Sequence, residues 1–234
     1  MTVKQIMAEL ESMGSENIRK IFLDHGIREP LFGVKIENLK IIQKKVKTDY
    51  VLAKELYATG NADAMYLAGL IADDEKMTAA DLGSWVKQAV SQNISEYTVP
   101  WVAAGSRQGY QLALEWIDAK EEHIAAAGWA TLSMLVALKN DQELDLVHLK
   151  LLLQRVVKNV SKADHRVRHA MNGFVIAAGT HVLSLYDDAM TTAKAIANLL
   201  GKQNGKSFKM PDAGSYLLKA NEKGLGKKKK TVKC

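Results

Sequence analysis

The chain has 234 residues, of which 47% are hydrophobic, and a formal net charge of +6. No apolar run approaches the ~20 residues that a membrane-spanning helix needs, and the start of the chain lacks the apolar core of a signal peptide. Cys234 is the single cysteine, which excludes an intrachain disulfide and favours a reducing, cytoplasmic setting.

Apolar residues recur at helical spacing over most of the chain and predict an all-α fold. Polar residues just ahead of several segments are typical of N-caps, namely Asn61, Thr78, Ser106 and Asp141. From residue 36 onward helix pairs repeat about every 30 to 40 residues, which is the period of two-helix solenoid repeats, although a globular helical bundle would look similar. The predicted helices are 3–10, 18–23, 36–46, 51–57, 61–72, 79–90, 94–104, 108–118, 121–138, 144–160, 163–178, 187–200 and 212–223.

Residues 201–211 interrupt the helical pattern. They centre on Asn204-Gly205, a dipeptide typical of tight turns, and predict a short hairpin or hairpin-like loop. We therefore expect a single helical domain over residues 1–224, followed by a flexible lysine-rich tail over residues 225–234.

The positive charge is concentrated near the end of the chain. From Lys202 to Cys234, ten lysines stand against Asp212 and Glu222, which gives +8 and leaves −2 for the rest. A local cluster of cations favours a polyanionic partner, with DNA first, although a lysine run can also be a solvated tail that keeps a protein soluble. The candidate phosphate-binding residues are Arg155, Lys158, Arg166, Arg168, Lys202, Lys206, Lys209, Lys227, Lys228, Lys229 and Lys230.

Motifs for metal or cofactor chemistry are weak or absent. His165 and His169 are one helical turn apart, but no third ligand accompanies them, so a surface pair explains them better than a metal site. The sequence contains neither a GxxxxGK loop nor a GxGxxG loop after a strand. We expect no metal and no cofactor.

A family resemblance is carried by six segments: 32–36, 61–68, 128–132, 167–179, 210–213 and 226–231. Together they resemble the DNA alkylation repair family, the HEAT-like repeat proteins typified by the glycosylase AlkD. The resemblance implies a curved solenoid of HEAT-like repeats, an α-α superhelix, whose cationic concave face cradles duplex DNA. AlkD-type enzymes excise N3- and N7-alkylated purines with one aspartate, two tryptophans and an arginine, without flipping the base.

The resemblance also implies that the catalytic residues are replaced. Trp101 or a close neighbour stands in the place of the catalytic aspartate, while the places of the arginine and the second tryptophan fall near Gly128 and Gly173. Excision passes through a cationic sugar, which a positioned carboxylate stabilises and a tryptophan does not. Glu96 and Asp118 are the weak catalytic candidates that remain. The pattern is similar to the AlkF/AlkG branch, which is associated with affinity for branched DNA and with lack of glycosylase activity.

We therefore expect a monomeric, cytoplasmic, nucleoid-associated protein that binds branched or distorted DNA without base excision. The alternatives are an alkylpurine DNA glycosylase that uses Glu96, Asp118 or Asp164 in a rearranged site, and a solenoid that binds other proteins. All four tryptophans lie in apolar helical stripes typical of core, but the resemblance keeps Trp101 and Trp129 as candidate groove aromatics.

Overall fold

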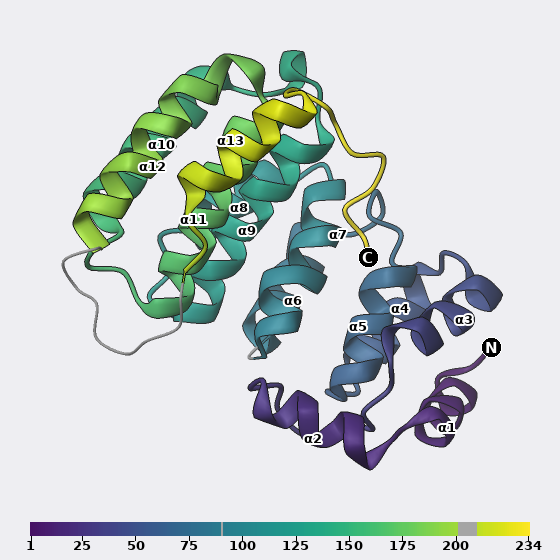
Figure 1. Cartoon of the computed structure of the whole chain (residues 1–234). Helices are drawn as coiled ribbons and strands as arrows, with labels where there is room; N and C mark the ends of the chain where they lie inside the picture. The colour runs from purple at the N-terminus through teal and green to yellow at the C-terminus, as the bar shows by residue number, and fades with distance from the viewer. Residues whose placement is uncertain (90, 201–209) are drawn as a thin grey trace. The chain divides into compact units, whose positions relative to one another are not determined.

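All the regular structure in the described residues, 1–89, 91–200 and 210–234 of a computed structural model, is helical (Figure 1). This confirms the all-α prediction. The chain forms two compact units, and the stretch expected to be one domain is divided between them. Unit 1 comprises residues 1–112 with Lys233 and Cys234, and unit 2 comprises residues 113–232.

The described residues of unit 1 form seven α-helices and one π-helical turn, η1, which leads directly into the last of these helices. Thr2 and Thr78 form capping boxes on α1 and α6, and the Asn61 side chain accepts from two backbone N–H groups at the start of α5. The N-cap predictions for Asn61 and Thr78 are thus confirmed. The elements are α1 (Val3–Met13), α2 (Glu16–Asp24), α3 (Ile36–Val46), α4 (Tyr50–Tyr57), α5 (Ala62–Ile71), α6 (Ala79–Gln88), η1 (Ile94–Thr98) and α7 (Val99–Gly105).

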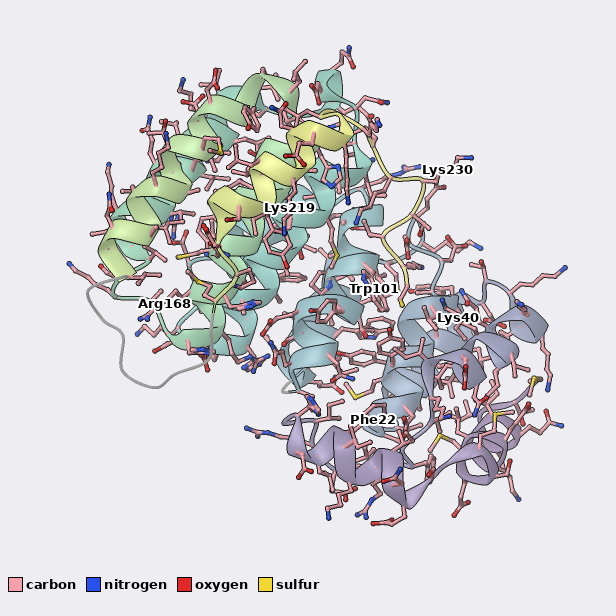
Figure 2. The ribbon with its side chains drawn as sticks, in the orientation of Figure 1. Phe22, Lys40, Trp101, Arg168, Lys219 and Lys230 are labelled. Atoms are coloured by element: carbon pink, nitrogen blue, oxygen red, sulfur yellow. The ribbon has the colours of Figure 1, made fainter. Side chains whose placement is uncertain are left out.

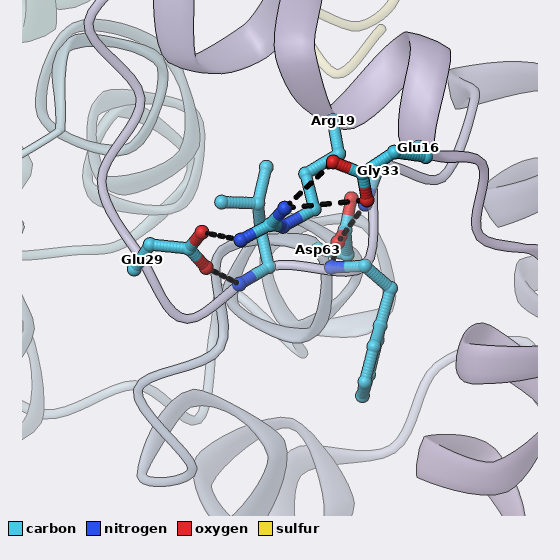
Figure 3. A network of polar contacts seen from close by, with 7 residues as sticks. Glu16, Arg19, Glu29, Gly33 and Asp63 are labelled. Atoms are coloured by element: carbon cyan, nitrogen blue, oxygen red, sulfur yellow. Dashed lines mark hydrogen bonds and ion pairs between the residues drawn. The ribbon is translucent and has the colours of Figure 1, made fainter.

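Helix α5 is the centre of unit 1, because every one of its residues is buried. Its one carboxylate, Asp63, accepts hydrogen bonds from the backbone N–H groups of Phe32 and Gly33 at 2.6 and 3.1 Å (Figure 3), and from that of Val34 at 3.0 Å. Burial raises the pKa of Asp63 above its usual range, against these three donors, which lower it. A single side chain therefore fixes the segment between α2 and α3 onto the core helix.

The π-helical turn η1 also lies against α5. Gly69 makes this approach possible, since a Cβ atom at that position would stand 2.4 Å from Cγ2 of Thr98. The sequence predicts one regular helix over residues 94–104, whereas the structure begins this helix with a π turn. The extra residue in a π turn changes which side chains face outward, and such turns are frequent at functional sites.

Unit 2 contains the longest helices of the described chain. Helix α9 packs along α11. Helices α12 and α13 also pack on α11, and α10 lies beside α12 (Figure 1). Gly179 lets α11 approach its neighbours closely, because a Cβ atom there would lie 2.6 Å from Leu217 of α13 and 2.7 Å from Ala189 of α12. The elements are α8 (Gly109–Trp116), in which the boundary between the units falls, α9 (Glu122–Leu138), α10 (Leu146–Asn159), α11 (His165–His181), α12 (Tyr186–Leu200) and α13 (Ala213–Lys223), with single 3₁₀ turns at Asp141–Glu143 and Leu183–Leu185.

Two predicted N-caps are wrong. Ser106 ends α7 and donates its hydroxyl hydrogen bond to the carbonyl oxygen of Ala103, because hydroxyl side chains can satisfy free carbonyl groups at a helix end as well as N–H groups at a start. Asp141 begins a 3₁₀ turn, and Asp145 caps α10 instead by accepting from His148 N at 2.9 Å.

The predicted last helix is confirmed as α13, whose N-cap is Asp212. The hairpin-like loop expected near residues 201–211 falls largely on 201–209, outside the described residues, as do its lysines Lys202, Lys206 and Lys209. Among the described residues, no helix is both long and apolar enough to cross a membrane.

Candidate nucleic-acid interface

The charge of the molecule is divided unequally between the two units. By sequence, unit 1 contains fourteen lysines and arginines against fourteen acidic residues, while unit 2 contains eighteen against twelve. The whole net charge of +6 therefore belongs to unit 2. Every cation that was proposed from the sequence as a phosphate contact and that the structure describes lies in that unit. A polyanion would thus be attracted to unit 2 rather than to unit 1.

Two of the four arginines and lysines of the helical patch have structural partners. Arg155 of α10 forms an ion pair with Asp118. Arg168 of α11, which is marked in Figure 2, donates from Nε to the carbonyl oxygen of Val160 at 3.1 Å and from Nη2 to that of Ala163 at 3.0 Å. These carbonyls lie just after the end of α10, where a cation is favoured by the helix dipole. Arg168 therefore ties α11 to the end of α10.

The other two members of the helical patch differ in exposure. Lys158, in the last turn of α10, is exposed. Arg166 is half-buried, and its backbone N–H donates to Oε1 of Glu122 at 2.9 Å. Lys158 is therefore the most exposed of these four cationic side chains.

The segment expected to be a flexible tail has defined contacts in unit 2. The N–H of Gly226 donates to the carbonyl oxygen of Thr180 at 2.9 Å, and that of Lys229 donates to Ala137 at 2.7 Å. Nδ1 of His181 lies 2.7 Å from the carbonyl oxygen of Lys227. Burial lowers the pKa of His181, which favours the neutral ring in this contact. Main-chain hydrogen bonds thus hold the first half of the segment against unit 2.

The four lysines of this run have different environments. Lys228 is only 17% exposed, and its ammonium contacts Oδ1 of Asp141 at 2.8 Å and the carbonyl oxygen of Val136 at 2.9 Å. The ammonium of Lys227 donates to the carbonyl oxygen of Lys223 at 2.8 Å. Lys229 and Lys230 are exposed, and Lys230 is marked in Figure 2. Lys229 and Lys230 are therefore accessible to a partner, whereas Lys228 contacts other residues of unit 2.

The two candidate groove aromatics are buried. Trp129 is fully enclosed in unit 2 and packs against Phe174 with ring centroids 5.4 Å apart. Trp101 is 3% exposed and meets the rings of Tyr66 and Tyr97 edge-on, at 5.1 and 6.5 Å between centroids. Neither tryptophan presents a ring face on which a base could stack, so the groove interpretation is wrong for both. The general expectation that the tryptophans are core residues holds.

Sequence reasoning missed Tyr97, the exposed aromatic residue beside Trp101. It lies on η1 and is 50% exposed, whereas its neighbours Ser95, Glu96 and Thr98 are buried. Burial of the other half of the ring, followed by the nearby charge of Glu96, raises the pKa of the Tyr97 hydroxyl. A regular helix pattern gave no signal for this residue, because its outward position depends on the π turn.

The three candidate carboxylates lie in different environments. Glu96 is 7% exposed, and its Oε2 accepts from the side-chain amide of Gln92 at 3.0 Å. Asp118 is 66% exposed and paired with Arg155, as described above. Asp164 is the exposed N-cap of α11. Among the described residues, no group of three or more histidine, cysteine or acidic side chains is arranged to hold a metal ion.

The two glycines that stand near the places of the glycosylase arginine and second tryptophan have opposite surroundings. A Cβ atom at Gly128 of α9 would lie 2.7 Å from the backbone nitrogen of Ile117 and 2.9 Å from the carbonyl oxygen of Ala113. A Cβ atom at Gly173 of α11 would meet nothing within 4 Å. The structure therefore leaves no room for a side chain at Gly128, whereas it leaves open space at Gly173.

Comparison with known proteins agrees with this architecture. A solved structure described as that of "a new family of proteins related to the HEAT-like repeat DNA glycosylases with affinity for branched DNA structures" superposes with a TM-score of 0.90 and 32% sequence identity over 100% of both chains. The fold is therefore the HEAT-like repeat fold related to that of these glycosylases.

Two bacterial proteins are similar along nearly their whole length. Uncharacterized protein Lin0241 of Listeria innocua and uncharacterized protein Lmo0209 of Listeria monocytogenes are each 29% identical over 228 residues, which is 95% of this chain and 98% of theirs. The family model described as "DNA alkylation repair enzyme" matches residues 6–217. The chain belongs to the DNA alkylation repair family.

Proposed function

We propose that this protein binds branched or distorted DNA, through the cations of unit 2, without excising a base. Family and fold support a DNA-binding role in repair. The preference for branched DNA is supported by the described affinity of the structural neighbour, which matches the chain over its full length. The charge distribution supports unit 2 as the binding side of the molecule.

The observation that supports binding without excision is the burial of Trp101. This residue or a close neighbour stands where the resemblance places the catalytic aspartate, and its ring is buried and contacts two tyrosines. The nearest acid in sequence, Glu96, is buried and accepts from Gln92. A cationic sugar could not be stabilised by a carboxylate at that position. The crowding at Gly128, near which the resemblance places the glycosylase arginine, leaves no room for an arginine side chain either.

Binding is tested with a four-way junction and a duplex of matched sequence, each titrated in mobility-shift assays at 50 and 200 mM salt. We expect tighter binding to the junction, and a steep salt dependence, since about six phosphate contacts would lower affinity about 10³-fold over this range. Equal affinity for the two DNAs would refute the preference for branches.

The assignment to unit 2 is tested by charge-neutralising variants. Lys229→Gln with Lys230→Gln removes two exposed cations of unit 2, and Lys44→Gln with Lys87→Gln removes two exposed cations of unit 1. The first pair should weaken binding and reduce the salt slope by up to about 1.8, while the second pair should leave both nearly unchanged. The reverse result would place the DNA on unit 1.

The absence of excision is tested by single-turnover release of 7-methylguanine from alkylated DNA with protein in excess. We expect no release above the protein-free control. Release that disappears in Glu96→Gln or Asp118→Asn would establish the alternative, a glycosylase with a rearranged site. Folding of each variant is checked by circular dichroism, because Glu96 is buried and Asp118 pairs with Arg155.

A further inference from the structure

Helix α13 is held in unit 2 by several side-chain contacts. The Asp212 side chain caps its start by accepting from Gly214 N at 3.1 Å and from the Ser215 hydroxyl at 2.7 Å. The preceding residue is held too, because the side-chain amide of buried Asn172 donates to the carbonyl oxygen of Pro211 at 3.0 Å. A helix fixed in this way presents its outer side chains in defined positions.

The inner face of α13 is equally well anchored. Leu217 is completely buried and fills the notch that Gly179 leaves on α11. At the other end of α13, the ammonium of Lys227 donates to the carbonyl oxygen of Lys223, one of the free carbonyls of the last turn. None of these anchoring contacts uses the side chain of Tyr216, Lys219 or Lys223.

Three of these outer side chains form a row. Tyr216, Lys219 and Lys223 stand at positions i, i+3 and i+7, which lie on one side of a helix. Tyr216 is 53% exposed, and both lysines are exposed (Lys219 is marked in Figure 2). Within the described residues, the structure records no hydrogen bond or ion pair for the ammonium of Lys219 or of Lys223.

An exposed aromatic residue by itself is common on protein surfaces. Leu218, on the other flank of the same helix, is exposed to the same degree, at 54%, and has no lysine in line with it. What distinguishes Tyr216 is its alignment with two exposed cations on the unit that carries the whole net charge. An aromatic ring next to a row of cations is the arrangement that binds unpaired nucleotides, because the ring stacks on a base while the cations contact the strand's phosphates.

We propose that Tyr216 stacks on a base exposed at the branch point of the DNA, while Lys219 and Lys223 contact consecutive phosphates of the same strand. The two lysines are one helical turn apart, about 6 Å along the axis, so both can follow one strand. Stacking depends on the face of the base and not on its edge, so the contact recognises an unstacked base of any sequence. This inference rests on the proposed function and names the contact that would give the preference for branches.

The stacking contact is tested with a four-way junction that carries 2-aminopurine at the branch point, where stacking against a tyrosine quenches fluorescence. Wild-type protein and Tyr216→Phe should both quench the probe, since each retains an aromatic ring. Tyr216→Ala should lose the quenching and bind the junction about tenfold more weakly, with little change for the duplex. Leu218→Ala is the matched control and should behave like the wild type.

Equal quenching by Tyr216→Ala and wild type would refute the stacking contact, while a junction preference that persists in the wild type would leave the proposed function intact. If the wild type itself shows no preference for the junction, the proposed function fails instead. Lys219→Gln with Lys223→Gln should lower the slope of log affinity against log salt by about 1.8. An unchanged slope would refute the phosphate contacts. Circular dichroism verifies that each variant retains its helix content.

Discussion

The same substitution should have opposite effects at two glycines of unit 2. In Gly128→Ala, the new Cβ atom would lie 2.7 Å from the backbone nitrogen of Ile117 and 2.9 Å from the carbonyl oxygen of Ala113. Backbone atoms cannot turn aside as a flexible side chain can, so α9 must shift away from the end of α8. Overpacking of this kind typically costs about 1–3 kcal/mol of unfolding free energy.

In Gly173→Ala, by contrast, the new methyl group meets nothing within 4 Å on α11. Replacing a helical glycine by alanine without a clash reduces the entropy of the unfolded chain and stabilises a protein by about 0.5–1 kcal/mol. The two variants should therefore differ in unfolding free energy by about 1.5–4 kcal/mol, although each adds the same methyl group to the interior of a helix.

The assay is urea denaturation followed by circular dichroism, with both variants and the wild type measured side by side. The midpoint should fall for Gly128→Ala and rise for Gly173→Ala, with unchanged slopes. Equal shifts of the same sign would refute the reasoning, because they would show that helix propensity alone decides both positions. Stable folding of Gly128→Arg would remove the steric argument against an arginine there.

Two further predictions concern carboxylates of unit 1. Asp63→Ala would leave three backbone N–H groups without their acceptor and should lower the unfolding free energy by about 3 kcal/mol or more. Asp49→Ala removes an N-cap that accepts from Leu52 N and should cost about 1 kcal/mol in the same denaturation assay. Equal costs for the two variants would contradict this reasoning. Burial raises the pKa of Asp81, but the ion pair with Lys54 and the donors of Thr78 outweigh burial and lower this pKa to about 2. The ionised carboxylate therefore stabilises the fold above about pH 4, and this contribution is lost as the pH falls toward 2. Asp81→Asn should thus be about 1–2 kcal/mol less stable than the wild type at pH 7, and the gap should narrow between pH 4 and pH 2 in pH-dependent denaturation; a gap that stays constant would contradict the assignment.

The helices could be predicted because their apolar residues repeat with the helical period. The segments expected at 61–72 and 121–138 correspond to α5 and α9 within a residue at each end. The π turn could not be predicted, since it depends on how closely η1 approaches Gly69 in a helix distant along the chain. Ser106 misled for a related reason: the same hydroxyl group can end one helix or begin the next, and the local sequence does not decide between them.

The candidate site was only partly predictable. The clustering of charge in the sequence was sufficient to propose phosphate-binding cations, and those of them that the structure describes lie in unit 2. Composition could not separate Lys228 from Lys229, because the difference comes from Asp141 and Val136, about 90 positions earlier in the chain. The row of Tyr216, Lys219 and Lys223 was readable as a helical spacing, but its significance depends on which face of α13 is buried.

The unequal environments of the lysine run have a consequence for chemical modification. An acylating reagent reaches an amine in proportion to its accessibility, so Lys229 and Lys230 should react early and Lys228, at 17% exposure, late. Mild acetylation would then neutralise the outward charge while the segment stays anchored through Asp141 and the main chain of Lys229. Within four consecutive lysines, the side chains that would attract a polyanion can thus be modified without breaking the contacts that hold the segment in place.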